Sequence, residues 1–97
     1  MRKELFAIFL FPLLSASTLA QEWKSVATEN ACTNRHENAL AAVDGKLILL
    51  GGRGLKPVES FDPKTKQWKT LAETPLEMHH FQAVTYKDEV WVLGAFT

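Results

Sequence analysis

Three histidines have the widest chemical range in this chain, because imidazole can bind metals and can transfer protons near neutral pH. They are His36, His79 and His80. His36 is followed by Glu37 but not by a second histidine four residues later, so the spacing of zinc proteases is absent. No carboxylate or thiol stands at a typical ligand spacing along the chain. The sequence therefore predicts structural histidines, no metal site and no cofactor.

A glycine-rich turn, Gly51-Gly52-Arg53-Gly54, carries the best candidate for ligand binding. It is not a phosphate loop, because the helix and the lysine that should follow are missing. Arg53 is the residue that could contact an anionic ligand such as a sugar acid, and the alternative is a solvated loop arginine. No serine stands in the context of a nucleophile elbow. The chain offers no catalytic constellation, so an enzyme is the less favoured interpretation.

The single cysteine and the charge balance limit the kinds of partner that this chain can bind. Cys32 has no second cysteine with which to form an internal disulfide. It is expected to be a small, partly buried residue or an idle thiol, and pairing with a second chain is the alternative. The 97 residues carry 11 basic and 11 acidic side chains. This balance argues against nucleic acid as a partner, because binding of phosphates needs a clustered excess of Lys and Arg.

The first 20 residues have the pattern of a signal peptide. A basic head, Arg2-Lys3, precedes an apolar run from Leu5 to Leu14, and small residues lead up to Ala20. The run is too short for a transmembrane helix, which needs about 20 apolar residues, although an uncleaved anchor is the alternative. We expect cleavage after Ala20 and export of residues 21–97 to the periplasm or the cell exterior, without membrane contact thereafter.

The elements that must position these side chains come as a repeat. The block His36–Gly51 recurs at His79–Gly94, 43 residues later, and Glu22–Ala27 resembles Gln67–Ala72 at an offset of 45. Repeats of this length bury their apolar faces by stacking on one another. Alternating apolar runs and the Asp44-Gly45 turn signal predict an all-β chain without helices. The predicted strands cover residues 22–26, 38–43, 46–50, 58–61, 67–71, 81–86 and 90–93.

Five residues carry a resemblance to the kelch repeat, the four-stranded blade of kelch-type β-propellers. Its marks are an apolar strand that ends in two glycines and, further on, an aromatic residue and a tryptophan with six residues between them. Here the glycines are Gly51 and Gly52, and the aromatic pair is Phe61 and Trp68. The second copy keeps Gly94 but has Ala95 in place of the second glycine. The glycines allow a sharp turn beside a neighbouring blade, and the rings fill space between blades.

The resemblance implies an incomplete propeller of about one and a half antiparallel blades after the signal peptide. Residues 35–71 would be the first repeat and residues 78–97 the first half of the second. The lone strand at 22–26 would complete a blade whose other strands, like the remaining blades, are absent from this chain. Propellers have four to eight blades, so we expect the exported chain to be an N-terminal fragment that is not a stable monomer. A truncated reading frame and a genuine short oligomerising protein both stay open.

The resemblance also implies a class of function. Such propellers are mostly recognition scaffolds, so the expected partner is a protein or carbohydrate on the loop face. The alternative is part of a carbohydrate-active propeller enzyme, similar to the exported sialic acid isomerases or to the copper-dependent galactose oxidases. The oxidase would need paired tyrosine and histidine ligands and a cysteine cross-linked to tyrosine. Tyr86 and Cys32 match no motif of that family, and no catalytic residue is carried over.

Overall fold

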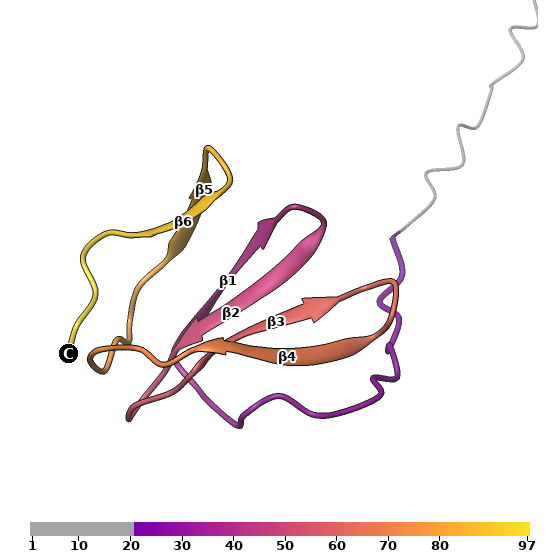
Figure 1. The fold of residues 1–97 in the computed structure, drawn as a ribbon, viewed down its shortest axis with the longest axis horizontal. Coiled ribbons are helices and arrows are strands. Elements are labelled where there is room, and N and C mark those ends of the chain that lie inside the picture. The colour runs from indigo at the N-terminus through magenta and orange to yellow at the C-terminus, as the bar shows by residue number, and fades with distance from the viewer. Residues whose placement is uncertain (1–20) are drawn as a thin grey trace, which may run out of the picture.

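A computed structural model describes residues 21–97, which form strands and loops without any helix (Figure 1). The prediction of an all-β chain is confirmed. Within the described residues no helix is long and apolar enough to pass through a membrane. The predicted signal peptide, residues 1–20, lies outside the described range. The strands are β1 (Asn38–Val43), β2 (Lys46–Gly51), β3 (Val58–Asp62), β4 (Gln67–Ala72), β5 (Ala83–Tyr86) and β6 (Glu89–Val92).

Strands β1 to β4 form one antiparallel sheet in chain order. The β1–β2 turn has Asp44 and Gly45 at φ of 48° and 72°. Both values are positive, as the predicted two-residue hairpin requires. In the β3–β4 turn, the carboxylate of Asp62 accepts a hydrogen bond of 2.8 Å from the backbone N–H of Lys64. The side chain of Asp62 thus caps the turn, as its sequence predicts.

Small and aliphatic side chains of β1 and β2 and one aromatic ring of β3 form the core of the sheet. Phe61 lies directly across from Trp68 in the β3–β4 register, with ring centroids 5.0 Å apart. The two aromatic marks of the repeat thus pack against each other across neighbouring strands. The buried apolar residues are Ala39, Ala41, Leu49, Leu50 and Phe61.

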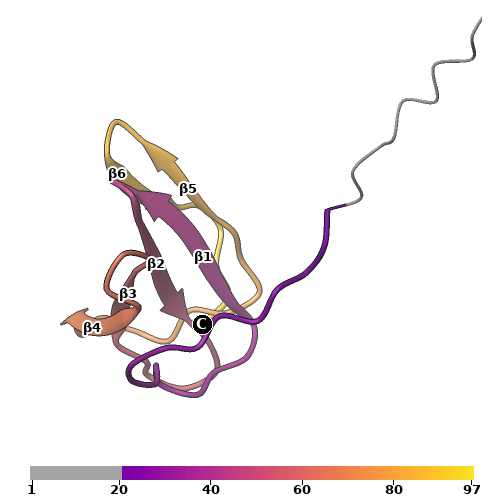
Figure 2. The same ribbon diagram turned by 90° about the vertical axis from the view of Figure 1, so that its right-hand side faces the viewer.

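Strands β5 and β6 form a second hairpin that lies beside β1 (Figures 1 and 2). The hydroxyl of Thr85 donates a 2.7 Å hydrogen bond to the carbonyl of Ala42 in β1. Near the other end of β1, the backbone N–H of Gly52 donates to the carbonyl of Met78 at 2.8 Å. The hairpin therefore packs on the first sheet as the start of a second unit, which is the arrangement that the repeat predicts.

Gly51 lies at a close approach between the two units. Its φ is +73°, and a Cβ placed there would lie 2.4 Å from the ring of Phe81 and 2.7 Å from the carbonyl oxygen of Met78. Neither distance leaves room for a methyl group. The first glycine of the predicted pair is thus required both by backbone conformation and by space.

A Gly51→Ala substitution should loosen the second hairpin. A left-handed non-glycine residue costs about 1–2 kcal/mol, and the clash with Phe81 and Met78 adds to this cost. Hydrogen exchange measured by mass spectrometry should show faster exchange over residues 78–92. Gly45→Ala is the matched control, because Gly45 also has positive φ but no atom within 4 Å of the added Cβ. Equal exchange in both variants would contradict the steric role of Gly51.

The segment 22–26, which was predicted as a strand, forms no strand in the structure. Trp23 is fully exposed, because no strand among the described residues pairs with this segment. The open edge of β4 is instead covered by Asn30, which follows this segment in the chain. The side-chain amide of Asn30 accepts from the N–H of Trp68 at 2.7 Å and donates to its carbonyl at 2.9 Å. One asparagine thus satisfies the edge position that a strand would occupy.

Candidate functional site

A cluster of charged and imidazole side chains gathers where the two units meet. We call Glu37, Arg53, Glu77, His79 and His80 the junction cluster. Glu37 immediately precedes β1, Arg53 lies in the β2–β3 loop, and the other three lie between β4 and β5. The fold brings these loops together because β1 and β2 are paired and the chain after β4 returns to Gly52.

Glu37 is the centre of the cluster. Its Oε2 atom accepts a 2.6 Å hydrogen bond from Nε of Arg53, and it lies 3.4 Å from Nδ1 of His80 and 3.8 Å from Nδ1 of His79. The hydrogen bond from Arg53 lowers the pKa of the Glu37 carboxyl below its usual value. Glu37 therefore keeps its negative charge to lower pH than a free glutamate does.

The two neighbouring histidines differ in environment. His79 is buried, pairs with Phe96 through two 3.0 Å backbone hydrogen bonds, and stacks its ring on that of Phe96. The side chain of His80 is 49% exposed. The two Nδ1 atoms are 2.7 Å apart, and Nε2 of His79 lies 3.5 Å from a carboxylate oxygen of Glu77. His36 is outside the group of potential metal ligands found in the described residues.

The predicted ligand-binding residue, Arg53, thus lies in a polar cluster and not alone. Its side chain is 49% exposed and is paired with Glu37, a contact that the sequence did not predict. The prediction that the chain has no metal site relied on spacing along the sequence, and it stays a prediction. In space, Glu37, His79 and His80 offer three ligand atoms that all lie within 4.8 Å of one another.

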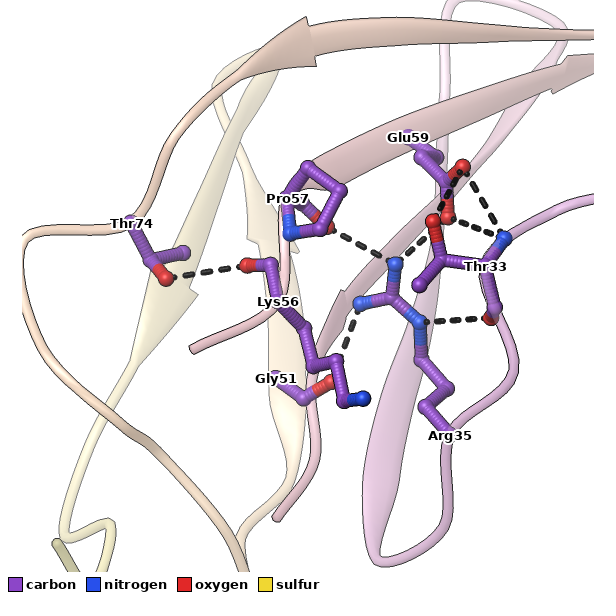
Figure 3. Close-up of polar contacts among 7 residues, drawn as sticks. All are labelled: Thr33, Arg35, Gly51, Lys56, Pro57, Glu59 and Thr74. Atoms are coloured by element: carbon purple, nitrogen blue, oxygen red, sulfur yellow. Dashed lines mark hydrogen bonds and ion pairs between the residues drawn. The ribbon is translucent and has the colours of Figure 1, made fainter. Parts of the chain in front are cut away.

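A buried ion pair supports the loop that carries Arg53 (Figure 3). The side chains of Arg35 and Glu59 are only 3% and 6% exposed and form a salt bridge. Arg35 also donates to the carbonyl of Gly51 at 2.9 Å and to that of Pro57 at 2.8 Å. These carbonyls lie at the two ends of the β2–β3 loop, so Arg35 holds the ends of the loop together.

The carboxylate of Glu59 also accepts hydrogen bonds from Thr33. Both of its carboxylate oxygens accept from the backbone N–H of Thr33 at 3.1 Å, and Oε1 accepts from the Thr33 hydroxyl. The ion pair between Arg35 and Glu59 was not predicted from the sequence. The available signal was the strand alternation, which places Glu59 on the same face of β3 as Phe61. A carboxylate on a buried face needs a cationic partner, and Arg35 is that partner.

Comparison with known proteins identifies the family. Residues 34–75 match the family model of the kelch motif. Kelch-like protein 36 of Rattus norvegicus is 32% identical to the chain over 78 residues, and so is that of Mus musculus. Those matches cover 76% of this chain. The chain is a kelch-repeat protein. Kelch repeat and BTB domain-containing protein 8 of Homo sapiens is 35% identical over 57 residues, which is 50% of this chain.

The kelch match covers the whole four-stranded sheet and so includes Gly51, Gly52, Phe61 and Trp68. The structure is accordingly one complete kelch blade followed by the first two strands of another. The chain spans 12% of the length of the Kelch-like protein 36 relatives. Glu37 and His80 are 43 residues apart and occupy the same position in the two repeats. Two members of the junction cluster, Glu37 and His80, therefore come from equivalent turns of neighbouring blades.

Proposed function

We propose that this kelch-repeat chain is an exported interaction scaffold that binds a protein ligand at the junction cluster. Kelch repeats generally serve as protein-interaction scaffolds. The observation that carries the proposal is the exposed Arg53–Glu37 pair beside His80, on loops whose backbone is fixed from below by Arg35. Polar side chains on loops that a rigid sheet positions are typical of recognition surfaces.

The proposed ligand is a protein and not a carbohydrate because Arg53 is already paired with Glu37. A sugar acid would have to compete with Glu37, which already accepts a 2.6 Å hydrogen bond from Arg53. A protein surface can contact both charges of the pair at once with side chains of opposite sign. Carbohydrate binding, which the family resemblance also implies, is therefore the competing outcome of the test.

Export is part of the proposal and has its own support. The basic head, the short apolar run and the small residues before Gln21 are the features of a cleaved secretory signal. A ligand would accordingly be met in the periplasm or outside the cell.

Site-specific photo-crosslinking tests the proposed surface. A photoreactive amino acid at Leu55, an exposed residue two positions from Arg53, should form a discrete adduct with one exported protein. The same probe at Lys64, in the β3–β4 turn at the opposite end of the sheet, should form none (Figure 1). Arg53→Glu should abolish the Leu55 adduct. Binding on a glycan array without any protein adduct would replace the proposal with carbohydrate recognition, and an adduct from Lys64 alone would contradict the assigned surface.

A further inference from the structure

Three potential ligand atoms of the junction cluster surround one point. Oε2 of Glu37, Nδ1 of His79 and Nδ1 of His80 are separated by 2.7, 3.4 and 3.8 Å. Zinc bonds of about 2.0–2.1 Å in a tetrahedral site place neighbouring ligand atoms about 3.3 Å apart. The three measured distances lie around that value. A position about 2.0 Å from all three atoms therefore exists, and this is the length of a bond from zinc to histidine nitrogen.

Direct hydrogen bonding accounts for only part of this arrangement. One imidazole can donate to the other across the 2.7 Å between their Nδ1 atoms. The Glu37 oxygen is 3.4 and 3.8 Å from the rings, which is beyond a normal hydrogen bond. Two imidazole nitrogens and a carboxylate oxygen that face one point are the donor set that divalent first-row metals prefer.

The surroundings of the three atoms also suit a metal. Glu77 lies 3.5 Å from Nε2 of His79, the ring nitrogen that faces away from the proposed ion. A carboxylate in this place orients a ligating imidazole and raises its basicity. On the other side, Arg53 binds the same Glu37 oxygen. The positive charge of Arg53 repels a metal cation and should therefore lower the affinity of the site for the ion.

The backbone explains how the residues converge. Glu37 and His80 both have left-handed conformations, with φ of 58° and 50°. Because they are equivalent positions of two repeats, the same turn directs both side chains to the junction between blades. The turn and the histidine at the position of His36 and His79 belong to the repeat, whereas Glu37 and His80 stand at equivalent positions and differ between the two copies.

The geometry points to a site for a divalent transition-metal ion such as zinc, formed by Glu37, His79 and His80 with Glu77 supporting His79. Three protein ligands leave a fourth position open, and the side chain of His80 is partly exposed to solvent. This inference revises the expectation from the sequence that the chain has no metal site, and it does not depend on the proposed function.

Calorimetric titration of the full chain with Zn²⁺ tests the site, with Co²⁺ absorption as a second readout. We expect one ion per chain. Glu37→Gln and His80→Gln should each weaken binding about tenfold or more, since each removes a ligand. Both side chains are partly exposed, and circular dichroism should show that both variants stay folded. His36→Gln is the matched control, because His36 stands outside the cluster, and it should bind like the unchanged chain.

Arg53→Met tests the site in the opposite direction, because this variant should strengthen the binding of Zn²⁺. It removes the competing cation from Glu37 and should tighten Zn²⁺ binding several-fold, because like charges in close proximity repel. The proposal is overturned if neither the unchanged chain nor Arg53→Met binds Zn²⁺. It is also overturned if binding survives in Glu37→Gln and His80→Gln, or if His36→Gln weakens it equally, since the ion would then be bound elsewhere.

Discussion

Replacing Arg35 with methionine is expected to lower the free energy of unfolding of the kelch blade by about 3–5 kcal/mol. The substitution leaves the carboxylate of Glu59 buried without its cationic partner, and it frees the carbonyls of Gly51 and Pro57. A loss of this size approaches the whole stability of a small domain. Far-ultraviolet circular dichroism should show loss of the sheet at temperatures where the unchanged chain is folded.

Two further variants separate the buried charge from other effects. Arg35→Met combined with Glu59→Leu should recover much of the lost stability, because a buried ion pair can be replaced by apolar side chains at little cost. Arg53→Met removes an arginine from an exposed ion pair and should leave thermal melting nearly unchanged. Similar melting of Arg35→Met and Arg53→Met would contradict the stabilising role of the buried pair.

Self-association of the isolated chain is expected to depend on the outer face of the β5–β6 hairpin. Four apolar side chains form an exposed apolar hollow on this face, namely Val84, Tyr86, Trp91 and Leu93. Among the described residues, β6 pairs only with β5, so its other edge is also open. Such a surface promotes pairing with other chains. Sedimentation velocity at micromolar concentration should detect oligomers.

Val84→Thr combined with Trp91→Thr should shift the chain to monomers. Threonine keeps the preference for a strand while removing most of the apolar area. Leu55→Thr is the control, since Leu55 is more exposed than Val84 or Trp91 but lies in a loop outside the hairpin. The interpretation fails if the unchanged chain sediments as a monomer, or if Leu55→Thr disperses the oligomers as effectively as the double variant.

The sequence predicted the local structure closely where a few neighbouring residues determine it. Asp44-Gly45 can adopt the positive φ values that close a tight hairpin, and Asp62 can cap its own turn. The pairing of Phe61 with Trp68 follows from the same short connection between β3 and β4. The segment 22–26 has a strand pattern but forms no strand here, because a strand pattern forms a strand only where a partner strand is present.

What the sequence determined by itself is the repeat: a kelch blade with its hairpins, its glycine pair and its aromatic pair. Only the tertiary structure decided which charged groups meet. Arg35 and Glu59 stand 24 residues apart, and Glu37 lies more than 40 residues from His79 and His80. Turn chemistry and strand alternation act over a few residues, whereas these contacts depend on how loops close and how one blade packs on the next. Histidines that look unpartnered along the chain consequently share one site with a glutamate in the folded protein.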